Sequence, residues 1–563
     1  MPAEIQDFYR QLAEQNTSLA ATRFILDHAT PDHTQSTLLG QQETRKGLGA
    51  IAQDSVVSEM KSQLDILSSQ PIDGGFEVKT RSAVKGILAG PGGVIAESRA
   101  PISWTNDGVD YWRQSEGQWK LQRSQPLKQT TEFQGQQVTV EAELKPAAEV
   151  LARRKAAVKE VLQPLPTLQF AGDLHDPAWL APYGAAQLVG LGEGSHGTEE
   201  IHQLKAQLFK QLATHHGFTV LTFEADPGYV YKLNRWVLGE GDEDLRDIFA
   251  LSQFNFTTQT TSELLTWMRQ QNKAGHQPPF EVWGIDSRTP SFTAGELYRL
   301  LLEGDAKRNT AALIQLSPER WYKFINDIDA FPEERQALKN LAGAVAQLPA
   351  SDPKLADIQY LAGALGQFDE LLDAYTAARD PKNAAALNRS LSLENEFMAR
   401  NAQKATAGRK GAVWAHNIHV GRSLPGSGSG IGTFLGESLG AERYQIICST
   451  PGRGKANAFE ELSGPNRRWE ARELLPPVAY QIDGLAASAL PPEQPAGYIS
   501  LKDFQAQPAL KEWLGKGMNF SQIGLLYAPG STTYQYPMNL DSCDGYVFVR
   551  ESSPSRLVKQ SGS

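Results

Sequence analysis

Cysteine is scarce in this chain, since only Cys448 and Cys543 occur among its 563 residues. Both lie in apolar stretches that are typical of strands. Two cysteines are too few for the disulfide framework of a small secreted domain. We therefore expect a reduced, cytoplasmic protein in which both thiols are buried.

Long apolar runs and basic blocks are absent as well. No apolar run approaches the roughly 20 residues that a helix needs to cross a bilayer. The first residues, MPAEIQDFYRQLAEQN, lack the basic start and apolar segment of a signal peptide. The formal net charge is −10, from 54 basic and 64 acidic residues. We therefore expect neither a membrane nor a nucleic acid as a partner.

The length of the chain predicts more than one domain. Residues 1–135 show helical patterns, among them residues 36–67, followed by alternating segments typical of strands, which predicts a small α+β domain. Residues 136–165 read as a linker helix ended by the sequence PLP. In residues 166–555, apolar runs alternate with helical patterns, which predicts an α/β domain with a mostly parallel sheet, flanking helices and a helical insertion at about 295–405.

The sequence VGLGEGSHGTEE at 189–200 permits two interpretations. Gly192, Gly194 and Gly197 satisfy G-x-G-x-x-G, the spacing of a dinucleotide-binding loop. However, Glu193 would place a carboxylate beside the pyrophosphate, so we favour a catalytic loop. In that loop the glycines would supply positive φ angles, and Thr198 would cap the following helix.

Polar residues follow four of the predicted strands. Glu193 and His196 follow one apolar run, Glu224 and Asp226 the second, Asp286 and Arg288 the third, and His416 and His419 the fourth. The carboxyl ends of parallel strands meet at one edge of a sheet, where ligands bind. We therefore expect these residues to share one site, although Asp286 and Arg288 could equally be a structural ion pair. His202, His215, His216 and His276 are interpreted as surface or hydrogen-bonded histidines.

Three stretches resemble the erythromycin esterase family in order and spacing: VGLGEGSHGTEEIHQLKAQLFKQLATHHGFTVLTFEAD, VWGIDS and VWAHNIHV. The resemblance covers about residues 170–550. It implies a mixed α/β fold with a helical cap and hydrolysis of macrolide lactones, and it places Glu193, His196, Lys205, Glu224, His416 and His419 at the active cleft. The stretch LENEFMARN departs from the family, with Glu394 and Arg400 where Arg and Glu are usual.

The N-terminal stretch YWRQSEGQWKLQRSQP resembles the last hairpin of NTF2-like domains, with a turn at Glu116 to Gln118. Such domains serve as enzymes, ligand pockets or dimerisation modules. We see no acid–base pair in residues 1–135 and expect this domain to fold independently without a catalytic group. A homodimer formed through it stays open.

The leading hypothesis is a hydrolase that uses water on an ester or lactone. Ser195 lacks the glycine spacing of a serine elbow, and we expect no such elbow in the chain. We expect His196, Glu193, Glu224 and His416 to be catalytic, with His196 as the general base. His419, Lys205 and Asp286 would bind substrate, without a cofactor or metal. Two alternatives stay open: a binding protein without turnover, and a metallohydrolase that uses the same histidines and carboxylates.

Overall fold

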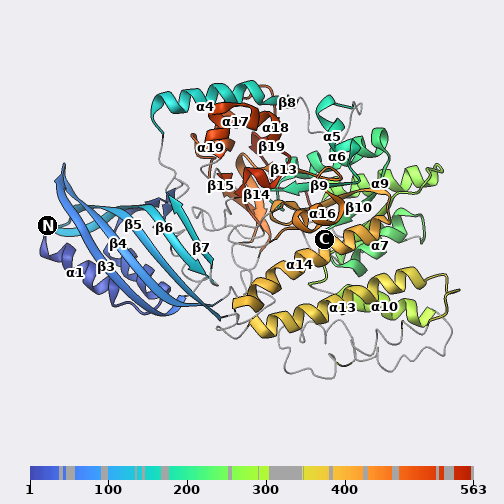
Figure 1. Ribbon diagram of the computed structural model, residues 1–563, viewed down its shortest axis with the longest axis horizontal. Coiled ribbons are helices and arrows are strands. Elements are labelled where there is room, and N and C mark those ends of the chain that lie inside the picture. Colours follow the sequence, from blue (N-terminus) through green and yellow to red (C-terminus); the bar gives the residue numbers. More distant parts are fainter. Residues whose placement is uncertain are drawn as a thin grey trace.

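The computed structural model contains an N-terminal sheet with helices beside it and a larger α/β body (Figure 1). The structure describes residues 1–36, 42–45, 48, 57–89, 99–133, 136–141, 146–165, 176–241, 243–251, 257–288, 291–303, 336, 345, 348–378, 384–422, 429–459, 468–514, 519–520, 522–524 and 538–558. Two further stretches lie largely outside these residues: the apolar run IGLLYAP at 523–529, which predicts a strand, and LPGSGSGIG at 424–432, which predicts a loop.

The N-terminal part is a seven-stranded sheet with helices α1 and α2 against it. Its strands follow the order β2-β1-β6-β5-β4-β3, with β7 beside β6, and only β1 and β6 pair in parallel. The expected α+β character of this part is confirmed. Its elements are α1 (Ala3–Ala13), α2 (Ser18–His28), β1 (Ala29–Ser36), β2 (Gln42–Thr44), β3 (Val57–Ile72), β4 (Gly75–Ala89), β5 (Arg99–Ser115), β6 (Gln118–Phe133) and β7 (Gln136–Glu141).

Helix α1 is held to the sheet by side chains at helical spacing. Ile5, Phe8 and Tyr9 are buried and recur at intervals of three and four residues, so they share one face. They pack in one apolar cluster with Trp112 and Leu121 of the sheet. This cluster joins helix and sheet into one core.

The helix predicted over residues 36–67 is wrong at β2 and from Val57 onward, where β3 begins, although Arg45 and Leu48 are helical. Met60, Ser62 and Leu64 are partly buried and alternate with exposed residues, which is the pattern of a strand. Nearly the whole of β3 pairs with β4. This tertiary pairing overrides the local helical preference.

The predicted hairpin turn after β5 is confirmed. Ser115 lies opposite Gln118, and the two residues between them, Glu116 and Gly117, have φ angles of 52° and 78°. Two residues with positive φ match the twist of the flanking strands, as in a tight hairpin.

The N-terminal sheet continues beyond residue 135, because β7 pairs with β6. Within the range expected to be a linker, α4 covers Ala148–Val161, and β8 covers Gln163–Leu165. Strand β8 pairs with β16 (Ala496–Ser500) of the main sheet. Val158 and Val161 of α4 are buried in a core cluster of the α/β body, to which this helix therefore belongs.

The main sheet has eight strands in the order β11-β10-β12-β9-β13-β19-β16-β8. The pairings from β11 to β19 are parallel, whereas β16 is antiparallel to both β19 and β8. The sheet is therefore mixed, and the expectation of a mostly parallel sheet missed its antiparallel edge. The other strands are β9 (Leu188–Glu193), β10 (Phe218–Phe223), β11 (Glu281–Gly284), β12 (Lys410–His416), β13 (Tyr444–Thr450) and β19 (Gly545–Val549).

Helices cover both faces of this sheet, and each face has its own apolar core. One core joins the strands to α6 (Glu199–His216), α7 (Pro227–Val237), α8 (Leu245–Ala250) and α9 (Gln259–Lys273). The other joins them to α4, α14 (Ala384–Thr406), α16 (Ile431–Leu439), α17 (Ile482–Ala489), α18 (Leu501–Ala506) and α19 (Pro508–Leu514). Strands β9 and β10 are buried along their whole length, as strands covered on both faces must be.

The described parts of the predicted helical insertion are mainly helical. Helix α13 (Leu355–Ala378) packs against both α14 and α10 (Ser291–Glu303), as Figure 1 shows, and α10 and α13 share an apolar cluster with Tyr231 of α7. The remaining short elements of the body are η1 (Ala178–Leu180), α5 (Ala181–Ala185), α15 (Asn417–Val420), β14 (Arg453–Ala458), β15 (Glu470–Leu474), β17 (Asn519–Phe520), β18 (Met538–Asn539), η4 (Leu540–Ser542) and β20 (Glu551–Ser552).

The two cysteines form a disulfide, so the expectation of two buried thiols is wrong. Cys448 lies on β13, and Cys543 directly follows η4 at the start of the segment that leads into β19. Because β13 and β19 are adjacent strands, their flanking residues meet, and the two Cα atoms lie 6.1 Å apart. The argument from reduced thiols to the cytoplasm therefore no longer holds.

Membrane insertion through a helix finds no support in the described part of the chain. No helix there combines the length and the apolar character that a bilayer span requires.

Candidate active site

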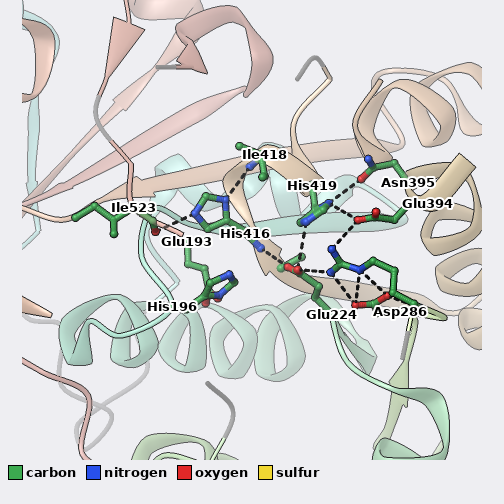
Figure 2. A network of polar contacts seen from close by, with 12 residues as sticks. Glu193, His196, Glu224, Asp286, Glu394, Asn395, His416, Ile418, His419 and Ile523 are labelled. Carbon is green, nitrogen blue, oxygen red and sulfur yellow. Dashed lines mark hydrogen bonds and ion pairs between the residues drawn. The ribbon is translucent and has the colours of Figure 1, made fainter. Parts of the chain in front are cut away.

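Polar residues from neighbouring strand ends meet at the carboxyl edge of the main sheet (Figure 2). Glu193 ends β9 and lies in register with His416, which ends β12. Glu224 directly follows β10, and its backbone N–H donates to the carbonyl oxygen of Trp414 on β12. The parallel pairing of these strands thus brings the predicted residues into one site.

Glu193 is the centre of one half of the site. Its Oε1 atom lies 2.5 Å from Nδ1 of His196, and its Oε2 atom accepts from Nζ of Lys205 at 2.6 Å. The indole N–H of Trp414 also donates to Oε2, at 3.0 Å. The Lys205 ammonium further contacts the carbonyl oxygen of Ala415 at 3.3 Å and lies over the Trp414 ring. Lys205 therefore holds Glu193 in place, and its side chain is fully buried.

Electrostatics keep this carboxylate ionised. Burial raises the pKa of Glu193, but Lys205 and His196 lower it by more, so the pKa lies well below its usual range. Burial lowers the pKa of Lys205 to about 8, against the opposing effect of Glu193. A buried carboxylate stays charged at neutral pH when such partners surround it.

His196 has one ring nitrogen fixed and one available. Its Nδ1 atom faces Glu193, and among the described residues this is the hydrogen bond that the ring makes, so Nε2 is left over. A carboxylate that accepts from Nδ1–H leaves the lone pair of Nε2 exposed to a reactant. This arrangement suits a general base.

His416 is held as a neutral imidazole. The backbone N–H of Ile418 donates to its Nδ1 atom at 3.3 Å, so the proton belongs on Nε2, which lies 3.1 Å from the carbonyl oxygen of Ile523. Burial and the neighbouring His196 lower the pKa of His416 to about 3. His416 is therefore a hydrogen-bond donor through Nε2 rather than a base.

Glu224 organises the other half of the site. Its Oε2 atom accepts from the backbone N–H of His416 at 2.8 Å, and its Oε1 atom lies 3.2 Å from Nε2 of His419. Burial raises the pKa of Glu224, but His419 and Arg288 lower it by more, to well below its usual range. Burial lowers the pKa of His419, yet Glu224 raises it by more, so the net shift is upward. The pair therefore favours the ionised carboxylate and the protonated imidazole.

Arg288 lies among three carboxylates. It is 3.1 Å from Glu224, 2.8 Å from Asp286 and 2.8 Å from Glu394 of α14. Asp286 accepts hydrogen bonds from both the guanidinium and the backbone N–H of Arg288. Arg288 is therefore its main partner. The Arg288 side chain is 33% exposed, which makes it the most accessible cation of the site.

Helix α14 supplies two site residues that the sequence did not predict. Asn395 lies with Oδ1 at 2.8 Å from Nδ1 of His419, and Glu394 bonds Arg288. The departure from the family pattern therefore reaches the site at Glu394, whereas Arg400 pairs with Glu396 on the surface. Trp414 and the Ile523 carbonyl were also missed, and the apolar run that contains Trp414 gave no sign of a polar role.

The glycines of the catalytic loop are required for close approach rather than for positive φ. Neither Gly192, Gly194 nor Gly197 has a φ in the left-handed region. A Cβ atom on Gly197 would lie 1.9 Å from the carbonyl oxygen of Asn457, and one on Gly194 would lie 2.5 Å from that of Ser449. The expectation of positive φ angles was wrong, because packing sets these positions.

The C-terminal segment anchors the loop and the start of α6. The carbonyl oxygen of Gly197 accepts from the backbone N–H of Ser555 at 2.8 Å, and Glu199 accepts from the Arg556 guanidinium at 2.7 Å. Thr198 stands at the N-cap position, but its hydroxyl makes no capping bond and pairs with nothing in the described chain. Contacts with the C-terminal segment therefore hold the start of α6 in place of the predicted Thr198 side-chain cap.

His202 does not fit its interpretation as a surface or hydrogen-bonded residue. It is fully buried on α6, and neither ring nitrogen has a hydrogen-bond partner among the described residues. Its Nε2 atom lies 3.9 Å from Glu193, and burial lowers the pKa of the ring. By contrast, His216 bonds Asp176 and His276 bonds a backbone carbonyl, as expected.

A G-x-S-x-G sequence does occur, at Gly436–Gly440, and the sequence expectation overlooked it. Ser438 lies within α16, is exposed, and donates its hydroxyl to the carbonyl oxygen of Phe434 at 2.8 Å. It is not on a strand-to-helix turn, so the expectation that no serine elbow exists holds for this motif.

The donor set suits acid–base chemistry better than metal binding. Within the described ranges, no group of three or more His, Cys, Asp or Glu side chains has the arrangement that a metal ion needs. Glu193 and Glu224 are already engaged by the cations of Lys205 and Arg288. A divalent ion would be repelled by these two cations or would have to displace them.

Parts of this chain are similar to known proteins. An erythromycin esterase type II of Escherichia coli is 31% identical over 103 residues, or 18% of this chain and 24% of that protein. The chain thus matches only about a quarter of this relative. A solved succinoglycan biosynthesis protein is 20% identical with a TM-score of 0.59 and covers 73% of this chain and 100% of its own. A solved Bacillus cereus protein is 22% identical with a TM-score of 0.57, covering 73% and 99%.

These two structures share the fold of the α/β body. The sequence profile described as Erythromycin esterase matches residues 213–552, which is more than half of the chain and includes Glu224, Asp286, His416 and His419. The chain therefore belongs to the erythromycin esterase family.

Proposed function

We propose that the protein is a carboxylic ester hydrolase that opens a lactone or cleaves an ester with water activated by His196. The observation that carries the proposal is the pairing of His196 Nδ1 with the ionised Glu193, which leaves Nε2 without a partner among the described residues. A histidine oriented in this way takes a proton from water near neutral pH.

The reaction follows from this geometry. Nε2 of His196 takes one proton from water, and the resulting hydroxide attacks the carbonyl carbon. Glu193 stabilises the imidazolium that forms, and Lys205 keeps Glu193 oriented. When the carbon–oxygen bond to the leaving alcohol breaks, the imidazolium returns its proton to that oxygen. The products are an acid and an alcohol, or one hydroxy acid from a lactone.

His416 is the donor best placed for the developing oxyanion. Its ring lies 5.0 Å from that of His196, centroid to centroid, and its Nε2–H points to the Ile523 carbonyl. An ester oxygen that takes the place of this carbonyl would receive the same hydrogen bond. One such donor contributes about 3 kcal/mol to the transition state in a dry site.

One side of the site is charged and is formed by Arg288, Asp286, Glu394 and His419. His419 and Glu224 neutralise each other, and Arg288 is shared by three carboxylates. In our proposal these groups position the substrate, while Glu224 fixes the backbone of His416, and none of them takes part in proton transfer. Lys205, which we expected to bind substrate, becomes a positioning residue for Glu193.

The experiment is hydrolysis of a panel by the purified chain: erythromycin and other macrolides, simple lactones and aryl esters. The named activity of the Escherichia coli relative makes erythromycin the first compound to test. Turnover of any member that is lost in His196→Asn supports the proposal. Saturable binding of several members without product would favour the alternative of a binding protein.

A further inference from the structure

The N-terminal part of the chain contains a cavity of about 250 Å³, far from the catalytic residues in sequence. It lies between helices α1 and α2 and one face of strands β3 to β6. Much of its wall is apolar or aromatic, with Phe8, Ile25, Met60 and Trp104 among the lining residues. A cavity with such a wall suits the body of a small organic molecule.

Asp110 is the only charged side chain among the described residues that line this cavity. The hydroxyl of Tyr9 donates to its Oδ2 atom at 2.8 Å, and the indole N–H of Trp112 donates to that hydroxyl at 3.0 Å. The Trp112 contact fixes the direction in which the Tyr9 hydroxyl donates. Asp110 is thus held in a defined position with neutral partners and no lining cation.

A second acceptor lies on the same strand. The Oδ1 atom of Asn106 is buried and has no hydrogen-bond partner in the described part of the chain. Asn106, Gly108 and Asp110 all line the cavity, and Gly108 between the two acceptors carries no side chain. A buried acceptor without a donor costs free energy, which a bound donor would recover.

We propose that this cavity binds a small organic ammonium ion with an apolar body, whose N–H groups donate to Asp110 and Asn106. The ammonium supplies the positive charge that the lining lacks, and a carboxylate on the wall of an apolar cavity is unfavourable without a cation. The rings of Phe8, Tyr9 and Trp104 add faces that attract cations. A neutral alcohol would satisfy an acceptor but leave the charge uncompensated, and a carboxylate ligand would be repelled.

In the free protein the surroundings of Asp110 disfavour its ionised form. Burial raises the pKa of Asp110, and the hydrogen bonds from Ser124 and Tyr9 oppose this only in part. No described cation lowers it. A bound ammonium would supply the missing stabilisation of the ionised form.

The test is calorimetric titration of the full chain with three probes of similar shape: 2-phenylethylammonium, 2-phenylethanol and 3-phenylpropanoate. We expect the ammonium to bind, the alcohol to bind at least about 10-fold more weakly, and the carboxylate not to bind. In Asp110→Asn the affinity for the ammonium should fall at least about 10-fold, to that for the alcohol. Asp107→Asn is the matched control, because Asp107 lies on the same strand but pairs with Arg81 at 2.6 Å outside the cavity lining.

A second variant guards against a folding defect in Asp110→Asn. Ala21→Phe fills the cavity from α2 and leaves the carboxylate in place, so it should abolish ammonium binding while circular dichroism stays native. Absence of ammonium binding to the wild-type chain would overturn the proposal. Equal binding of the three probes, or unchanged ammonium binding in Asp110→Asn or in folded Ala21→Phe, would do the same.

Discussion

The imidazole rings of His196 and His416 lie with centroids 5.0 Å apart and planes inclined at 45°. They come from the loop after β9 and from the end of β12, two strands that pair in parallel. Both nitrogens of His416 contact backbone atoms, whereas only Nδ1 of His196 is bonded to a described residue. The pair therefore combines one fixed donor with one available base.

Replacement of His196 should remove the general base. We expect His196→Asn to lower kcat by about 10²- to 10⁴-fold with little change in KM, because a positioned base accelerates proton transfer by that range. His216→Asn is the control, since His216 pairs with Asp176 at the far end of α6. A kcat near that of the wild type in folded His196→Asn would contradict the assignment.

Lys205 should matter for both stability and activity. In Lys205→Met, Glu193 is left as a buried charge without its cation, which should lower the free energy of unfolding by about 3 to 5 kcal/mol. Adding Glu193→Gln removes that charge, so the double variant should recover much of the stability and stay inactive. Urea denaturation and the hydrolysis assay check this. A single variant as stable as the wild type would show that Lys205 does not hold Glu193.

Chelation should leave turnover unchanged. Glu193 and Glu224 are ion-paired with Lys205 and Arg288, and His416 has both nitrogens engaged, so the proposed reaction uses no metal. The measurement is the hydrolysis rate after prolonged dialysis against a strong chelator. Loss of activity that zinc or manganese restores would instead identify the histidines and carboxylates as ligands.

The disulfide should contribute measurably to stability. Because Cys448 and Cys543 are 95 residues apart, the bond restricts the unfolded chain strongly, and its loss should cost about 2 to 4 kcal/mol. The double variant Cys448→Ala, Cys543→Ala compared with the wild type in urea measures the difference. Thiol titration of the denatured protein should find none before reduction and two after it. Two thiols before reduction would contradict the bond.

The stabilisation provided by His419 should depend on pH. Its pKa in the folded chain is raised above the ordinary value of about 6.5 by Glu224. A raised histidine pKa gives stability that is fully present below about pH 6.5 and is lost as the pH rises through the folded value. The stability difference between the wild type and His419→Asn should therefore be larger at pH 6 than at pH 9. An equal or larger difference at pH 9 would contradict the raised pKa of His419. His276→Asn is the control, because this histidine bonds a backbone carbonyl rather than a carboxylate.

The sequence predicted the site because the strands that carry it are continuous apolar runs. Glu193, Glu224 and His416 each end or follow such a run, and parallel pairing then fixes their common edge. Family resemblance added Lys205. This residue lies within helix α6, so the ends of the strands could not indicate it. Residue types and order along the chain were sufficient for this part.

Other features depend on tertiary contacts that local patterns do not encode. The sequence of β3 predicted a helix, because nothing in its own residues indicates that it pairs with β4. The Ile523 carbonyl meets His416 through a backbone atom, so any residue type would serve there. Glu394 and Asn395 reach the site because α14 packs beside it, and the two cysteines meet because β13 and β19 are neighbours.

The contacts of Ser555 and Arg556 with Gly197 and Glu199 also bear on how the protein is made. Residues near position 555 leave the ribosome long after the loop of His196 has been synthesised. Until then, this loop and the start of α6 lack one of their anchors, even if the sheet has formed. We therefore expect a purified chain that ends before position 553 to be compact but to lack the proposed activity.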